Sequence, residues 1–442
     1  MADNQKKMIL TAAIMHGVGM HLGAWMARDG DVTDYINPKL YIDIAKMAEA
    51  GKLHSLFLAD ALTNAEEGTD RPCGYFDTVT LLSFMAAVTK RVGLSGTAST
   101  TYNQPYDIAR RFGTLEHLSQ GRSGWNAVAT FLPAASAQFG GRDLPSHAER
   151  YTRGDEFIEV VLKLWDSWKE GAVVGDKQSG VFANPELVDE INHSGQFFQV
   201  KGPLPFPRSP QGRPVIIQAG SSEEGKTQAA KYADVVFTSQ HLMEPAVEFR
   251  NDMRARAVAN GRRADSLKVL PGVSLILGKT EEEARERARR LENVLGTQPQ
   301  LVKLARRVGL PVEAMKLDEP LPVHLLSPDK EFAGSIGFRR SIVNLAVQSN
   351  MTVRQLIVHY GGGHQYFVGS AEKAADMMQA WMQAGAADGF NIMIDMLPSG
   401  VELLVDLLVP ELQKRNLFHR DYEFSTLREN LGLADVSLAS AA

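Results

Sequence analysis

Eight short apolar runs, separated by longer segments of helical period, are the strongest constraint on how this 442-residue chain folds. Such runs, rich in Val, Ile and Leu, indicate buried strands, and apolar residues recurring every three or four positions indicate amphipathic helices. The alternation predicts repeated strand-helix units, which close into a barrel when there are eight of them. The predicted strands are 8–14, 54–59, 92–98, 122–127, 214–219, 234–238, 268–276 and 389–395.

The predicted helices lie between these strands. Pro105 is suited to the first turn of one helix, and Ser146 with Glu149 forms a capping box at the start of another. The helical ranges are 38–51, 76–90, 105–119, 148–170, 223–232, 243–260, 280–296, 371–385 and 400–415.

The chain is longer than a minimal barrel, because eight strand-helix pairs need only about 250 residues. We therefore expect an α/β fold, a TIM (β/α)8 barrel that forms a single domain over 1–442, with insertions near 61–75, 171–212 and 297–350. The third insertion follows the seventh strand and its helix, and we expect it to fold over the barrel mouth as a lid.

Composition restricts the partners of this chain. Its 47 Lys and Arg residues and 52 Asp and Glu residues give a formal net charge of −5, which provides no basic field for nucleic acid. The single cysteine, Cys73, excludes an internal disulfide and a cysteine zinc cage, and fits a reducing compartment. The apolar run after Lys6 and Lys7 is far shorter than the roughly 18 residues of a membrane span. These features predict a cytoplasmic enzyme.

Polar residues stand where several of the predicted strands end. Asp60, Thr97, Asn126 and the pair Ser221 and Ser222 each follow or end an apolar run. In a parallel barrel all strand tails point to one face, so these side chains should converge on one ligand. A single residue of this kind is often only a turn or cap residue, and the prediction therefore depends on their joint placement.

Two helix starts have the character of anion sites. His147 and Tyr151 are four residues apart at the start of a helix and so share one face. In AGSSEEGKT, Gly220 permits close backbone approach before a helix that opens with hydroxyl groups. Free N–H groups at helix N-termini favour phosphate.

Two other interpretations of these residues stay open. Gly220, Gly225, Lys226 and Thr227 also match the Walker A pattern of a nucleotide triphosphatase, although two glutamates in the loop disfavour phosphate. His16 and His21, with Asp60, could suggest a metal pair. The absence of HExxH and His-x-His patterns instead favours a role for His16, His21 and Trp25 in lining a substrate cavity.

The succession FLAD, SGTASTTYNQPYDIARRFGTLEHLSQGRSGWNAVAT, HAERYTRGDEFIEVVLKLWDSW and RSPQGRPVIIQAGSSEEGK resembles the bacterial-luciferase-like flavin monooxygenases. The similarity is to the nitrilotriacetate and dibenzothiophene-sulfone monooxygenase group, and it extends over nearly the whole chain. It implies an FMN-dependent TIM-barrel monooxygenase that uses FMNH2 from a separate NAD(P)H-dependent flavin reductase, and O2. A C4a-hydroperoxyflavin would transfer one oxygen atom to a small organic substrate.

The resemblance also implies roles for the candidate residues. Asp60, Thr97 and Asn126 match positions near the flavin ring, whereas His147, Tyr151, Ser221 and Ser222 match positions that hold the ribityl chain and phosphate. His147 or His16 would hydrogen-bond the peroxide, with Asn126 beside the reacting ring. The chain has NAVATFLP where relatives commonly show NVVTS, and it diverges over 297–350.

The substrate is not fixed by these patterns. It could be an aminopolycarboxylate, an organosulfur compound or another xenobiotic. Arginines could clamp its carboxylates, or aromatic residues could form an apolar pocket; the candidates are Arg71, Arg142, Arg339 and Arg340 for the first, and Trp25, Phe131 and Phe206 for the second. We expect a homodimer or homotetramer. A P-loop triphosphatase and a non-catalytic flavin-binding protein are the alternatives.

Overall fold

The computed structural model describes residues 7–14, 17–60, 62–63, 72, 76–141, 143–220, 222–332, 334–359, 363–434 and 436. Within these residues, eight parallel strands form a closed ring in the order β10-β9-β4-β3-β2-β1-β13-β11, and pairing of β10 with β11 completes it. This arrangement confirms the predicted TIM barrel, and every barrel strand lies on a predicted range. The strands are β1 (Ile9–Ile14), β2 (Ser55–Leu58), β3 (Gly93–Ser99), β4 (Ser123–Val128), β9 (Val215–Ala219), β10 (Val235–Thr238), β11 (Lys268–Gly278) and β13 (Gly389–Ile394).

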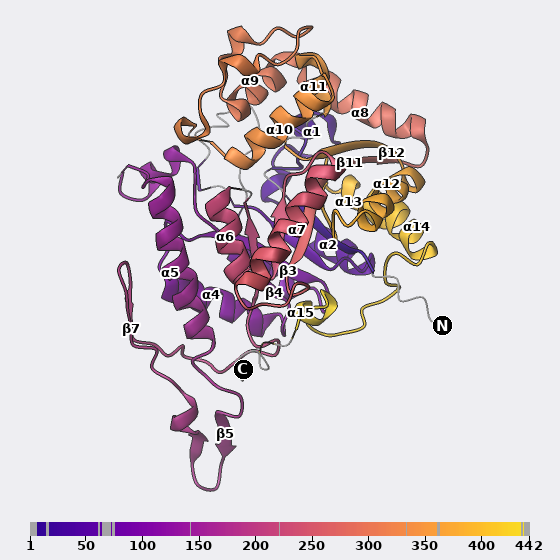
Figure 1. Ribbon diagram of the computed structural model, residues 1–442. Coiled ribbons are helices and arrows are strands. Elements are labelled where there is room, and N and C mark those ends of the chain that lie inside the picture. Colours follow the sequence, from indigo (N-terminus) through magenta and orange to yellow (C-terminus); the bar gives the residue numbers. More distant parts are fainter. Residues whose placement is uncertain are drawn as a thin grey trace.

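Helices surround the barrel (Figure 1), and most begin and end within a few residues of the predicted ranges. The expected helix at 400–415 is interrupted by a π turn, Leu404–Leu408. Pro410 follows this turn and cannot donate the backbone hydrogen bond that a regular helix needs there. The helices are α2 (Pro38–Ala50), α3 (Thr78–Ala86), α4 (Pro105–Leu118), α5 (His147–Trp165), α6 (Glu223–Tyr232), α7 (Met243–Ala259), α8 (Glu281–Leu295), α12 (Ala371–Gln383), α13 (Ser399–Leu403) and α14 (Val409–Lys414).

One additional strand, β12 (Gln365–Ser370), is not predicted by the sequence pattern. It pairs with the second half of β11, from Val273 to Gly278. Five of its six residues are only partly buried, so it lacks the continuous apolar run that marks the barrel strands.

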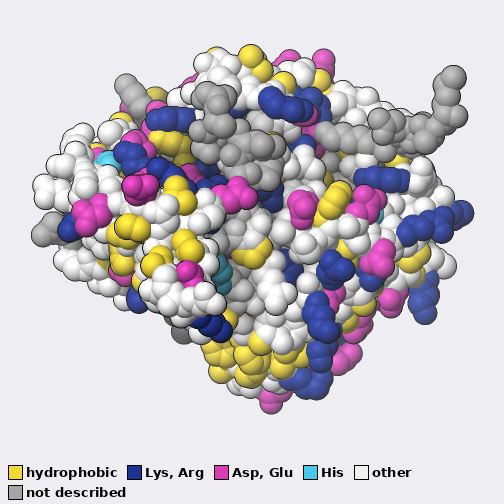
Figure 2. Space-filling view, turned by 90° about the horizontal axis from the view of Figure 1, so that it is seen from below, with side chains coloured by type: hydrophobic (Ala, Val, Ile, Leu, Met, Phe, Trp, Pro, Cys, Tyr) yellow, Lys and Arg dark blue, Asp and Glu magenta, His cyan; other side chains and the backbone are white. Residues whose placement is uncertain are grey.

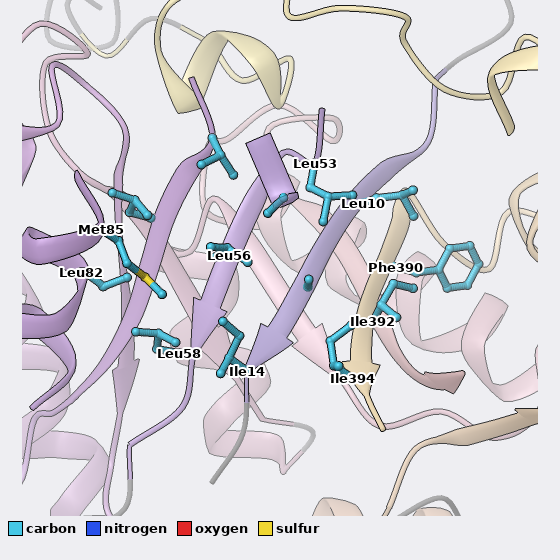
Figure 3. Close-up of a cluster of buried hydrophobic side chains, with 14 of the residues drawn as sticks. Leu10, Ile14, Leu53, Leu56, Leu58, Leu82, Met85, Phe390, Ile392 and Ile394 are labelled. Atoms are coloured by element: carbon cyan, nitrogen blue, oxygen red, sulfur yellow. The ribbon is translucent and has the colours of Figure 1, made fainter. Parts of the chain in front are cut away.

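The two faces of the barrel strands carry different side chains, as the two-residue period of a strand requires. Outward residues pack beneath the helices. Figure 3 shows Leu56, Leu10 and Ile392 on the neighbouring strands β2, β1 and β13, with Leu82 and Met85 of α3 on the side of Leu56. Each such fully buried side chain contributes about 1.5–3 kcal/mol through removal from water. This outer layer forms the main hydrophobic core of the molecule.

The interior of the barrel holds a second, smaller core. Ile9, Phe57, Ile217 and Met393 project into it from four strands. Leu427, the first residue of α15 (Leu427–Asn430), packs against them and lies beside Gly93 at the start of β3. The amino-terminal end of the barrel is therefore closed by α15, and the carboxyl ends of the strands form the mouth.

Two insertions project from opposite ends of the molecule (Figure 1). Within 171–212, β5 (Val173–Asp176) pairs with β6 (Val181–Ala183), and β7 (His193–Ser194) pairs with β8 (Gln199–Val200). At the other end, α9 (Thr297–Val308), α10 (Ile336–Gln348) and α11 (Val353–His359) pack around their own core, which includes Leu301, Leu304, Val308, Ile342, Leu345 and Leu356.

The surface seen in Figure 2 has acidic and basic side chains interspersed, which gives that face no field of a single sign. Among the described residues, no helix combines the length and the apolar character that crossing a bilayer requires.

The carboxylate of Asp388, just before β13, is fully buried and ties helix α7 to the barrel. It accepts hydrogen bonds from Arg250 Nη2 at 2.7 Å, from Arg254 Nη2 at 3.2 Å and from the backbone of Val269 at 3.0 Å. Removing one partner of a buried ion pair leaves the other charge uncompensated.

We expect Asp388→Ala to lower the free energy of unfolding by about 3–5 kcal/mol, measured by urea denaturation. The control is Asp265→Ala, which removes an exposed pair with Arg263 (2.8 Å) and should cost less than about 0.5 kcal/mol. Equal losses in the two variants would contradict a stabilising role for the buried carboxylate.

Candidate functional site

Two polar side chains meet inside the barrel mouth, on neighbouring strands. Thr97 of β3 and Asn126 of β4 are in register, and Asn126 Nδ2 donates to Thr97 Oγ1 at 2.8 Å. Both residues are buried, and Asn126 Oδ1 has no hydrogen-bond partner among the described residues. A buried acceptor without a partner is costly, so this oxygen is suited to a donor on a bound molecule.

A second polar group forms where α5 and α6 begin. The rings of His147 and Tyr151 have centroids 4.9 Å apart, as their four-residue spacing predicts. The Tyr151 hydroxyl hydrogen-bonds Ser222, and burial raises the pKa of Tyr151. Ser222 is the N-cap of α6, and its Oγ accepts from Gly225 N at 3.1 Å. Two helix N-termini and a neutral phenol therefore lie together, which is an arrangement suited to an anion.

A hydrogen-bonded network holds these two helices in place. Gln228 of α6 donates to Asp155 of α5 at 2.8 Å and accepts from Gln218 of β9 at 2.7 Å. Gly154 allows this close approach, because a Cβ there would lie 3.0 Å from the Gln228 amide. The network fixes Tyr151 relative to strand β9 and to the start of α6.

One cation near this group, Arg150, was not predicted from the sequence. Arg150 is half-buried, and its charge acts on both Tyr151 and Tyr102. It lies three residues after His147 on α5, so the helical spacing that paired His147 with Tyr151 could have identified it. One carboxylate is also close, since Glu224 Oε2 lies 3.7 Å from His147 Nδ1.

The remaining predicted residues lie as follows. Asp60 is partly buried and follows the end of β2 by two residues, next to β3 in the barrel order. The structure thus brings together Thr97 with Asn126, and His147 with Tyr151 and Ser222. Four predicted residues, His16, Arg71, Arg142 and Ser221, lie outside the described residues.

The Walker A interpretation does not fit the geometry of α6. Lys226 Nζ forms ion pairs with Glu223 at 2.6 Å and with Asp252 of α7 at 2.9 Å. Its side chain therefore faces α7 instead of the loop that would hold phosphates. Thr227 Oγ1 donates to the Glu223 carbonyl within the helix, which also occupies the hydroxyl that would bind magnesium.

A cavity opens at the mouth beneath the α9–α11 insertion. Its barrel side includes Ser274 of β11 and Met393 of β13, and its outer wall includes Lys303 of α9 and Ile357 of α11. His21 also lines it, which agrees with the prediction for that residue. Two of its carboxyls are Asp395, bound by Arg287 at 2.6 Å, and Glu292, which accepts from the Tyr366 hydroxyl at 3.4 Å.

Several residues proposed for substrate binding lie elsewhere. Phe206 packs against Gly113 of α4 and His117, in the outer layer of the barrel, so its assignment to the pocket is wrong. Arg339 is buried over the Phe332 ring within the insertion, and Arg340 pairs with Asp329 at 2.7 Å. Neither arginine lines the cavity at the mouth. Trp25 is partly buried in a small cluster with Val18 and Leu291.

The known proteins that are similar to this chain include several monooxygenases and a riboflavin lyase. The family model described as luciferase-like monooxygenase matches residues 19–388. The N-acetyl-S-(2-succino)cysteine monooxygenase of Bacillus subtilis is 41% identical, over 97% of this chain and 98% of that protein. Nitrilotriacetate monooxygenase component A of Aminobacter aminovorans is 40% identical, over 94% of each chain. A riboflavin lyase solved with a modified FMN and riboflavin is 27% identical, with a TM-score of 0.84 over 99% of this chain and 100% of that one.

The mouth carries buried histidines whose ring nitrogens are unsatisfied among the described residues: His241 Nε2 and His364 Nδ1. Burial lowers the pKa of His241 to about 4 and, together with the charges of His241, Arg307 and Lys303, lowers the pKa of His364 to about 3. Burial and then Lys303 lower the pKa of His21 to about 4. These three side chains are therefore neutral at pH 7.

Acid should destabilise the protein through these histidines. Their folded pKa values lie below the unfolded value of about 6.5, so the unfolded chain binds more protons as the pH falls below that value. Each histidine should lower the free energy of unfolding by about 1 kcal/mol when the pH falls from 6.5 to 5.5, measured by urea denaturation at each pH. His364→Gln should give a shallower loss of stability over this interval, and an unchanged slope would show that the pKa of His364 is not lowered by folding.

Proposed function

Because the chain belongs to the luciferase-like monooxygenase family, we propose that it is the oxygenase component of a two-component flavin monooxygenase. It receives FMNH2 from a separate NAD(P)H-dependent flavin reductase and uses O2 to oxygenate a small organic molecule. The Tyr151 and Ser222 cluster at the starts of α5 and α6 is the observation that carries this proposal.

The phosphate of FMN fits this cluster. The Tyr151 hydroxyl is a neutral donor, the first turn of α6 presents backbone N–H groups, and Arg150 adds a positive charge beside Tyr151. Ser221 and His147 complete the proposed set. Glu224 is half exposed and turns toward His147, so its charge is partly screened by solvent.

The isoalloxazine ring fits the barrel mouth beside Thr97, Asn126 and Asp60. A reduced ring carries N–H donors, and Asn126 Oδ1 is a buried acceptor without a partner among the described residues. Strand β4, which carries Asn126, pairs with β9, which leads into the Ser222 turn, so ring and phosphate sites follow adjacent strands.

The chemistry belongs to the flavin, which when bound would supply an oxygen atom through the C4a-hydroperoxide that the family resemblance implies. The protein orients the ring, supplies hydrogen bonds and excludes water under the α9–α11 insertion. His147 is beside Tyr151, and this position favours phosphate binding for it over contact with the reacting oxygen. That role then falls to Asn126 and His16. The relative named component A supports a separate reductase partner.

Oxygen incorporation tests the activity directly. With FMN, NADH, a flavin reductase and 18O2, we expect one labelled oxygen atom in the product from at least one member of a substrate panel. The panel contains nitrilotriacetate, N-acetyl-S-(2-succino)cysteine, dimethyl sulfide, a sulfone and an alkane. If the protein binds FMN but no compound of the panel yields a labelled product, it is a non-catalytic flavin-binding protein. Magnesium-dependent ATP hydrolysis would instead indicate a nucleotide triphosphatase.

The phosphate site makes a separate prediction about affinity. Tyr151→Phe and Ser222→Ala should each weaken FMNH2 binding by about 1–3 kcal/mol, measured by anaerobic fluorescence titration, because each removes a hydrogen bond to a charged group. Ser222→Asp keeps an N-cap but adds a negative charge, so it should bind less tightly than Ser222→Ala.

A matched control separates cap loss from ligand loss. Thr280→Ala removes the N-cap of α8, where Thr280 Oγ1 accepts from Glu283 N at 3.2 Å, and should leave FMNH2 affinity unchanged. If both Tyr151→Phe and Ser222→Ala bind FMNH2 as tightly as the wild type, the proposed phosphate site is wrong.

A further inference from the structure

Two buried histidines, His241 and His364, stand at the barrel mouth away from the strands that carry the proposed flavin residues. His241 follows the end of β10 by three residues, and His364 immediately precedes β12. His364 lies against Gly272 of β11, and β11 is opposite β3 in the closed ring. The histidine pair therefore faces Thr97 of β3 across the mouth.

The ring of His364 lies within the mouth, because it packs on inward-facing residues of the barrel. A Cβ at Gly272 would lie 2.4 Å from His364 Nδ1, so the glycine leaves room for the imidazole. The rings of Phe237 and His364 have centroids 5.2 Å apart, and Phe237 is 5.9 Å from Phe57 of β2. Aromatic rings thus connect the histidine side of the mouth to β2, the neighbour of β3.

Other contacts hold His364 in this position. Phe338 of α10 packs edge-on against the imidazole, with ring centroids 5.3 Å apart. The Ser239 hydroxyl, just after β10, donates to the carbonyl of Gly363 and so ties the segment before His364 to the barrel. The histidine is therefore oriented before any ligand arrives, which lowers the ordering cost of binding.

The histidine pair has polar atoms without partners. His241 is 8% exposed and His364 is 2% exposed, and in the described part of the chain neither His241 Nε2 nor His364 Nδ1 forms a hydrogen bond. Buried polar atoms are normally paired, because leaving them unpaired is costly. Asn126 Oδ1, on the other side of the mouth, is unpaired in the same way. Unsatisfied atoms on both sides favour a polar ligand between them.

We propose that His241 and His364 bind a polar oxygen of the substrate, and that this enzyme therefore acts on an oxygen-bearing molecule instead of a plain alkane or dialkyl sulfide. A neutral imidazole carries one N–H group, so each ring can donate a hydrogen bond to a sulfonyl, carbonyl or carboxylate oxygen. The rings of Phe57 and Phe237 receive the apolar part. The inference rests on the proposed function and selects among its substrate classes.

Equilibrium dialysis with the flavin-free protein tests this assignment without requiring turnover. The probes form pairs in which one member lacks the oxygen atoms. They are dibenzothiophene sulfone with dibenzothiophene, N-acetyl-S-(2-succino)cysteine with dibutyl sulfide, and octanoate with octane. At least one oxygen-bearing probe should bind about tenfold or more tightly than its partner, because it alone satisfies the buried nitrogens.

Variants of the two histidines separate hydrogen bonding from shape. His364→Leu and His241→Leu should each weaken binding of that probe by about tenfold and leave its oxygen-free partner within about twofold. His364→Asn and His241→Gln keep an amide near the unpaired ring nitrogen and should retain affinity within about threefold. The control is His117→Leu on α4, where His117 Nε2 bonds the Pro207 carbonyl at 3.0 Å, and it should leave probe binding unchanged.

Nitrogen-15 NMR of the wild-type protein gives a second readout that does not depend on the folding of any variant. Addition of the tight-binding probe should shift the ring resonances of His241 and His364 and leave those of His54 and His117 in place. The proposal is overturned if no oxygen-bearing probe binds more tightly than its partner, if both leucine variants bind like the wild type, or if the His241 and His364 resonances do not respond. FMNH2 affinity and 18O incorporation are measured separately, so failure of the proposed function is distinguishable from failure of the histidine site.

Discussion

The common direction of the eight barrel strands is the constraint on which the rest of this structure depends. Closure of the ring by β10 and β11 places every carboxyl-terminal strand end at one mouth, while α15 fills the other end. Residues that are distant in the sequence thereby come to the same mouth. Asn126 and Ser222, for example, lie at the ends of paired strands or directly after them.

The site residues are held by groups that do not themselves face the mouth. Gln218 projects from the outer face of β9 to Gln228, which in turn holds Asp155 of α5. Arg153 donates to the Thr100 carbonyl at the tail of β3. These contacts fix the start of α5 against two strands and one helix, so Tyr151 is positioned before a ligand arrives. Such preorganisation reduces the free energy that binding must spend on ordering side chains.

The sequence predicts the barrel well because its signals are local. Each strand is a continuous apolar run, and cap residues such as Ser146 and Pro105 mark helix starts that the structure confirms. The pairing of His147 with Tyr151 follows from helical geometry alone. Strand β12 is missed because its six residues alternate weakly, and Arg150 is missed because its role depends on two tyrosines, one of them from another loop.

The substrate end of the site is harder to predict from sequence, for a physical reason. Neither Lys303 nor Phe206 stands in a sequence pattern that indicates its position. Only the three-dimensional packing shows that Lys303 lines the mouth and that Phe206 lies under α4. The family resemblance covers the segments that carry the residues proposed to bind the flavin. The resemblance says much less about the outer wall of the cavity, because that wall belongs to the insertion at 297–350, where the sequence diverges.

The α9–α11 insertion has a hydrophobic core of its own, which bears on how the substrate preference of this enzyme can change during evolution. Leu304 and Ile342 hold α9 in place without help from the barrel interior, where Phe57 and Met393 pack. Side chains on the inward stripe of α9 can therefore be exchanged with little disturbance to either core. Side chains on that helix face can then change over evolution without altering the residues proposed to bind the flavin.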